Sequence, residues 1–119
     1  MARPKTKPGE ERLSASEWQI MRICWRLGRA NVRQILKEDL KKKTRDYRTI
    51  LTFVSRMEKK GFLKVEKEGN TNYYTPAMPQ ERGLRHEIDR FLKEVVGSKR
   101  EHLELVRKAV ERKLRRRRP

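Results

Sequence analysis

The sequence of 119 residues has one cysteine, few glycines or prolines, and no long apolar run. Cys24 alone cannot form an intramolecular disulfide, and its apolar surroundings predict a buried side chain rather than a redox sensor. No apolar segment approaches the roughly 20 residues needed to span a bilayer, and residues 1–12 lack the apolar core of a signal peptide. We therefore expect a cytoplasmic protein without membrane insertion.

The sequence also lacks the motifs of common catalytic and cofactor sites. It contains neither a GxGxxG motif nor a P-loop, and no Cys or Ser nucleophile has a convincing base nearby. The segment His86-Glu-Ile-Asp-Arg90 begins like the helix of a zinc protease, but Arg90 stands where the second histidine is required. We expect neither an enzyme nor a bound cofactor or metal.

Acidic residues are scarce relative to basic ones. The chain has 33 Lys and Arg against 16 Asp and Glu, a formal net charge of +17 that predicts a polyanionic partner. The excess is not confined to the C-terminal end, because residues 41–60 contain eight basic residues against two acidic ones. With only 34% hydrophobic residues, the chain has material for one modest core.

Apolar periodicity predicts three helices in the first half of the chain, over residues 16–27, 32–40 and 47–60. The segment Ser14-Ala-Ser-Glu17 matches a capping box, in which a hydroxyl and a carboxylate satisfy free amides at a helix start. Asn31 and Asp46 can cap the second and third helices. We expect the apolar faces of the three helices to share a core, with Trp18 and Trp25 in it or near it.

Beyond the third predicted helix the pattern changes to short β-prone segments. Residues 62–67 and 72–76 favour strands, and Glu68-Gly-Asn-Thr71 can form the turn between them. The predicted fold is therefore mainly α with a small β-hairpin. Three helices followed by a hairpin are the order of a winged helix-turn-helix, which we assign to residues 13–78.

A second helical block follows Pro79 and is interrupted at Gly97. Its apolar residues lie at helical spacing but have no core of their own, so burial against a second copy of the chain is the simplest explanation. The predicted dimerisation residues are Leu84, Ile88, Phe91, Leu92, Val95, Leu103, Val106 and Val110. We assign residues 79–111 to this helical dimerisation region, residues 1–12 to a flexible basic arm and residues 112–119 to a basic tail. Within that tail we expect the run Arg115–Arg118 to be disordered.

The outer face of the third predicted helix is rich in hydrogen-bond donors. A B-DNA major groove admits an α-helix, so outward Arg and Thr side chains can reach base edges while Lys and Arg hold phosphates. The predicted DNA-contacting residues, including neighbours before the helix and in the hairpin, are Lys43, Arg48, Thr49, Thr52, Ser55, Arg56, Lys59, Lys67, Asn70 and Asn72. The alternative is an ordinary solvated face, and Lys59 and Lys60 can either hold phosphates or only solubilise the helix end.

Several segments resemble the penicillinase and copper repressors, the BlaI/MecI/CopY family. They are Leu13-Ser-Ala-Ser-Glu-Trp-Gln-Ile-Met21, Asp46-Tyr-Arg-Thr-Ile-Leu-Thr52, Arg56-Met-Glu-Lys-Lys-Gly61 and Tyr73-Tyr-Thr-Pro76. The resemblance covers roughly residues 13 to 96. It implies a homodimeric winged-helix repressor that binds an inverted-repeat operator in double-stranded DNA, often with TACA-like half-sites. It also implies that the recognition helix meets DNA at Arg48, Thr49, Thr52 and Arg56.

Two features of that family are missing from this sequence. Copper-sensing members have a Cys-x-Cys hook near the C-terminus, whereas this chain has only Cys24, so we do not expect metal sensing. Penicillinase repressors are inactivated by cleavage at an Asn-Phe bond in the dimerisation region, and this chain contains no Asn-Phe dipeptide. Cleavage elsewhere stays open, which keeps a sensor protease among the candidate partners.

The positive charge alone is compatible with two other classes of protein. A basic architectural or RNA-binding protein would coat nucleic acid without reading its sequence. An interaction module would use the same winged-helix fold to bind an acidic protein. The first alternative predicts little discrimination between duplexes, and the second predicts weak DNA binding once the basic C-terminal end is removed.

Overall fold

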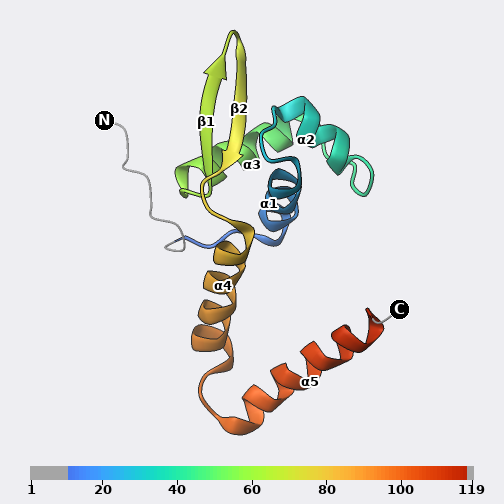
Figure 1. Cartoon of the computed structure of the whole chain (residues 1–119), viewed down its shortest axis with the longest axis vertical. Helices are drawn as coiled ribbons and strands as arrows, with labels where there is room; N and C mark the ends of the chain where they lie inside the picture. Colours follow the sequence, from blue (N-terminus) through green and yellow to red (C-terminus); the bar gives the residue numbers. More distant parts are fainter. Residues whose placement is uncertain (1–10, 118–119) are drawn as a thin grey trace. The chain divides into compact units, whose positions relative to one another are not determined.

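The computed structural model describes residues 11–117, and the chain divides into two compact units, one ending at Gly83 and one beginning at Leu84. Most of the predicted N-terminal arm lies outside the described residues, as do residues 118–119. The first unit contains three helices and a hairpin, in the predicted order (Figure 1). Within residues 11–117 no helix is long and apolar enough to cross a membrane.

The three helices of the first unit are α1 (Ala15–Leu27), α2 (Val32–Asp39) and α3 (Tyr47–Lys59). Each begins at the predicted cap. Ser14 and Glu17 form a complete capping box on α1, and Asn31 accepts from the amide of Gln34 on α2. Asp46 Oδ1 accepts from the amide of Thr49 at 2.8 Å on α3. Side-chain caps satisfy amides that have no partner within the helix, so they determine where each helix starts.

One apolar core joins the three helices to the hairpin. Its most buried members are Ile20, Met21, Cys24, Ile35, Ile50, Val54, Met57 and Leu63. Trp18 and Trp25 pack against this core, as predicted, and the indole Nε1 of Trp25 donates to the carbonyl oxygen of Met78 at 2.9 Å. Cys24 is buried as predicted, and burial raises the pKa of its thiol to about 12.

The hairpin, which we call the wing, pairs β1 (Leu63–Glu68) antiparallel with β2 (Thr71–Pro76). Gly69 has a φ of 64°, a conformation that the tight turn requires and that glycine adopts without strain. The backbone of Tyr74 also exchanges two hydrogen bonds with Ala30, at 2.8 and 3.0 Å. The wing is therefore held by the loop between α1 and α2, a contact that the sequence did not predict.

The second unit is helical. Helix α4 (Gln80–Phe91) begins in the first unit and is followed by η1 (Leu92–Val96), a turn of π-helix, and by α5 (Arg100–Arg116). The helical structure is interrupted at Gly97, as predicted, and this glycine has a φ of 81°. Helix α5 continues through Arg116, so the first two residues of the Arg115–Arg118 run are helical rather than disordered as predicted. The division at Gly83 lies five residues beyond the predicted boundary, because Gly83 is buried and an added Cβ would lie 3.0 Å from the Trp25 ring.

Candidate nucleic-acid interface

Helix α3 presents two chemically different faces. Its apolar residues Ile50, Val54 and Met57 are fully buried in the core. The predicted contact residues occupy the other side, where Arg48, Thr52, Arg56 and Lys59 are exposed and Thr49 and Ser55 are partly buried. At about 100° per residue these six positions fall within one stripe of roughly a third of the helix circumference. The stripe contains no carboxylate, so it favours an anionic partner.

Thr49 and Thr52 both use their hydroxyl groups within the protein. The backbone amide and the side chain of Thr49 both form hydrogen bonds with the Asp46 carboxylate. These hydrogen bonds hold the pKa of the Asp46 carboxyl below its usual value. Thr52 Oγ1 donates to the carbonyl oxygen of Arg48 at 3.0 Å. Because the hydroxyl proton of Thr52 is occupied, the methyl group of this exposed side chain is its principal feature for an outside partner.

Tyr74 connects α3 to the wing. Burial raises the pKa of its phenol, and side-chain hydrogen bonds with Ser55 and Asn72 act in the opposite direction. Tyr74 and Asn72 both lie on β2, whereas Ser55 lies on α3, so the bond with Ser55 joins the two elements. Both Ser55 and Asn72 were predicted to contact DNA, and Ser55 also helps to position the wing against α3.

The remaining predicted contacts lie on the wing and beside α2. Lys67 and Asn70 are exposed near the turn of the wing, and Lys43 is exposed in the link between α2 and α3. Arg29 was not among the predicted residues, yet its guanidinium lies 3.9 Å from the ring centroid of Tyr73 and donates to Glu68. No sequence pattern indicates this contact, because the loop and the strands meet only in the folded chain.

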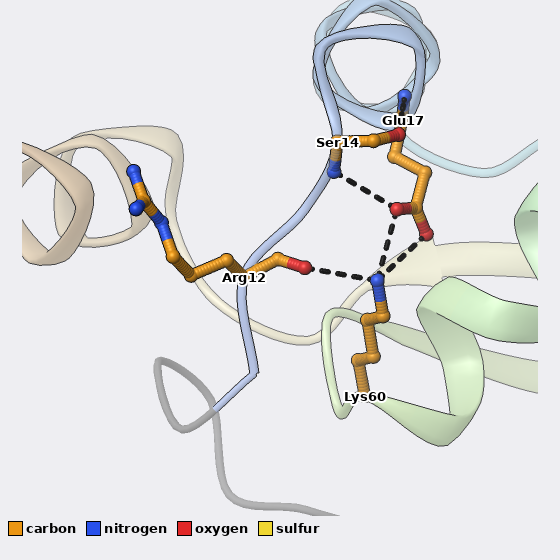
Figure 2. A network of polar contacts seen from close by, with 4 residues as sticks. All are labelled: Arg12, Ser14, Glu17 and Lys60. Atoms are coloured by element: carbon orange, nitrogen blue, oxygen red, sulfur yellow. Dashed lines mark hydrogen bonds and ion pairs between the residues drawn. The ribbon is translucent and has the colours of Figure 1, made fainter.

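Lys60 belongs to a structural network rather than to the basic face. Its Nζ donates to Glu17 Oε1 at 2.9 Å and to the carbonyl oxygen of Arg12 at 2.9 Å (Figure 2). Burial opposes ionisation of Glu17, but hydrogen bonds from Ser14 and Lys60 outweigh it and hold the pKa of Glu17 below 4.5. Neither role predicted for Lys60, phosphate binding or solubilising the helix end, describes this side chain.

Arg45 is a second basic residue whose charge is neutralised within the protein. Its guanidinium donates to Asp39 Oδ1 at 2.7 Å and to the side-chain oxygen of Gln19, and all three residues are buried or partly buried. The contact anchors the link before α3 to α1 and α2. The basic segment 41–60 therefore presents less positive charge to an outside partner than its composition indicates.

The family model described as penicillinase repressor matches residues 13–116 of this chain. This chain belongs to the penicillinase repressor family. The penicillinase repressor of Bacillus licheniformis is 36% identical over 64 residues, which are 54% of this chain and 50% of that protein. An uncharacterized 16.5 kDa protein of Latilactobacillus sakei is 38% identical over 90 residues, which are 74% of this chain and 60% of that protein. The matches thus span half to three fifths of these relatives' lengths.

Solved structures of penicillinase repressors confirm the winged-helix fold. The DNA-binding domain of the repressor BlaI is 32% identical and aligns with a TM-score of 0.55 over 63% of this chain and 89% of that domain. The monomeric form of BlaI from Bacillus licheniformis, solved in complex with the blaP half-operator, aligns with a TM-score of 0.52 and 32% identity over 60% of this chain and 87% of its own. The resemblance predicted from sequence is confirmed, and the family's named members are repressors rather than enzymes.

Proposed function

We propose that this chain is a transcriptional repressor that binds an inverted-repeat operator in double-stranded DNA as a homodimer, in the cytoplasm. In this proposal α3 enters the major groove, and the wing lies along the adjacent backbone or minor groove. Repression follows from occupying a promoter. The observation that carries the proposal is the carboxylate-free stripe of Arg48, Thr52, Arg56 and Lys59, on a domain similar to one solved with half-operator DNA.

The assignment of roles on α3 follows from the side chains that stay exposed. Arg48 and Arg56 have the donor geometry to bind guanine with two hydrogen bonds, and the methyl group of Thr52 can contact that of thymine. Lys43, Lys59 and Lys67 suit phosphate contacts, which add affinity without reading sequence.

The proposal of a dimer rests on the second unit, because most of its apolar side chains are exposed in a single chain. The exposed fractions are 55% for Ile88, 62% for Val95, 52% for Val110 and 39% each for Leu84, Phe91 and Leu103. Leu92 and Val106, also in the predicted set, are partly buried. On α5 the stripe continues to Leu114, which is 62% exposed, so the surface available to a second copy is longer than predicted.

A sensor protease is the second protein partner in the proposal. Its place of cleavage would be the turn at Gly97 and Ser98, which separates η1 from α5 and whose residues are exposed. Cutting there would separate α5 from the rest of the chain and remove half of the proposed dimer surface. Limited proteolysis with a protease of broad specificity tests the access, with first cleavage expected at residues 97–99.

The decisive experiment is fluorescence anisotropy of the chain with a TACA/TGTA inverted repeat and a scrambled duplex of equal composition. Because α5 includes Leu114, the basic end is best neutralised by Arg115→Gln, Arg116→Gln and Arg117→Gln rather than by truncation. At about 0.15 M salt we expect a preference for the repeat of roughly 10³-fold or more. Near-equal binding, persisting after selection from random sequences, would mean a nonspecific nucleic-acid-binding protein. Weak binding to every duplex would mean a protein-interaction module.

A further inference from the structure

A cavity of about 390 Å³ lies between α1 and the end of α2. Of the residues that line it, only Lys43 belongs to the proposed DNA interface. Five cationic side chains line it, and we call it the basic hollow: Arg22 and Arg26 from α1, and Lys41, Lys42 and Lys43 from the link after α2. Its volume is at the lower end of the roughly 300 to 1,000 Å³ typical of small-molecule sites.

The backbone gathers the three lysines at one edge of the basic hollow. The amides of Lys42 and Lys43 both donate to the carbonyl oxygen of Asp39, at 3.0 and 2.8 Å, so the chain turns tightly at the end of α2. Arg22 and Arg26 are four residues apart on α1, which places them on one side of that helix. Helix α1 and the link after α2 thus both contribute cationic side chains to the basic hollow.

Two carboxylates also line the basic hollow, and both are already paired. Glu38 accepts from Arg26 at 3.2 Å and from Lys41 at 2.9 Å, which fixes these two cations in place. Asp39 is buried and pairs with Arg45 at 2.7 Å. No carboxylate within residues 11–117 forms an ion pair with the remaining three cations, Arg22, Lys42 and Lys43.

We infer that the basic hollow is a binding site for phosphate groups of a polyanion, held by Arg22, Lys42 and Lys43. Three uncompensated cations match the charge of two or more linked phosphates, and Arg can bind a phosphate with two parallel hydrogen bonds. The phosphates can belong to a free polyphosphate or to the DNA backbone. The inference does not require that α3 reads DNA sequence.

The test uses the full chain and a charge-matched control. Isothermal titration with sodium tripolyphosphate at about 0.15 M salt should show saturable binding at one site. Arg22→Gln with Lys42→Gln should weaken it by roughly tenfold or more, because two of the three uncompensated cations are lost. The control, Arg33→Gln with Lys37→Gln, removes the same charge from residues of α2 that do not line the basic hollow, and it should change the affinity much less. Thermal unfolding of each variant verifies that it is folded.

Titration of a DNA duplex with the same variants separates the two sources of phosphate. If the basic hollow holds the DNA backbone, the Arg22/Lys42 variant binds the duplex more weakly than the control variant does. Its affinity also depends less steeply on salt concentration, by the slope of up to about two phosphate contacts. If it holds a free polyphosphate, the two variants bind DNA alike and differ only with tripolyphosphate. Equal effects of the two variants in both titrations would overturn the proposal, because net charge alone would then explain the binding.

Discussion

The guanidinium of Arg29 stacks on the ring of Tyr73, 3.9 Å from its centroid, and donates a hydrogen bond to Glu68. Glu68 is the last residue of β1 and Tyr73 lies in β2, so one side chain from the α1–α2 loop holds both strands of the wing. The backbone bonds between Ala30 and Tyr74 reinforce the contact. The position of the wing therefore depends on the α1–α2 loop as well as on the contact between Tyr74 and Ser55 of α3.

Replacing Arg29 should loosen the wing while leaving the domain folded. We expect Arg29→Ala to lower the free energy of unfolding by about 1 kcal/mol or less, because exposed cation–π contacts and ion pairs are weak. Hydrogen exchange at wing amides should nevertheless become faster. Arg33→Ala, which alters an exposed arginine on α2, is the control, and unchanged exchange in Arg29→Ala would show that the backbone contacts suffice.

Arg48 and Arg56 should carry sequence discrimination. Arg48→Ala or Arg56→Ala should cost about 1 to 3 kcal/mol of operator affinity and relax specificity at one operator position. Anisotropy with a panel of single-base operator variants measures this. A loss of the same size on every sequence would assign the residue to a phosphate instead.

Thr52 should act through its methyl group, because its hydroxyl donates to the carbonyl oxygen of Arg48. Thr52→Val keeps a methyl group in place and should retain operator preference. Thr52→Ser removes it and should cost about 0.8 kcal/mol, the value of one buried methylene-sized group. An operator with deoxyuridine in place of the contacted thymine supplies the control, since the difference between Thr and Ser should vanish there.

The contact between Glu17 and Lys60 should stabilise the fold by joining the start of α1 to the end of α3. Lys60→Met leaves the buried Glu17 carboxylate without its cation, and we expect a cost of about 3 kcal/mol in the free energy of unfolding. Urea titration measures this. Lys59→Met removes an exposed neighbouring lysine and should cost far less. Glu17→Gln combined with Lys60→Met should be more stable than Lys60→Met alone, because no unpaired charge is then buried.

The same contact predicts a dependence on pH. The pKa of Glu17 is lower in the folded protein than its ordinary 4.5, so the unfolded chain binds the proton more readily. The stability that Glu17 contributes is present above about pH 4.5 and is lost as the pH falls through the folded-state pKa. Stability of the Glu17→Gln variant should therefore fall less steeply in acid, and parallel curves for the two proteins would contradict this role.

Dimerisation should depend on one face of α5. Leu103 lies on the stripe shared with Val110 and Leu114, whereas Leu105 is rotated by about 200° from it. Leu103→Asp should therefore yield a monomer in sedimentation equilibrium, and Leu105→Asp should leave a dimer even though Leu105 is the more exposed of the two, at 65% against 39%. A monomeric wild-type chain, or equal effects of the two substitutions, would argue against this interface.

Features encoded by neighbouring residues could be predicted from the sequence. Caps at Ser14, Asn31 and Asp46 act over three residues, so the starts of the helices follow directly from local chemistry. The apolar spacing that buries Ile50, Val54 and Met57 also shows which side of α3 faces solvent. Helix α5 continues two residues into the Arg115–Arg118 run, which was predicted to be disordered because like charges repel, whereas arginine is also a good helix former.

The helices, the wing, the core and the basic outer face of α3 follow from the sequence alone, because each depends on the periodicity and caps of a single segment. Which basic residues remain available to a partner depends instead on contacts between distant segments of the folded chain. Lys60 and Arg45 pair with Glu17 and Asp39 across 43 and 6 residues, respectively, and Arg29 reaches the wing across 39. Charge is a property of composition, but its compensation depends on which side chains folding brings together.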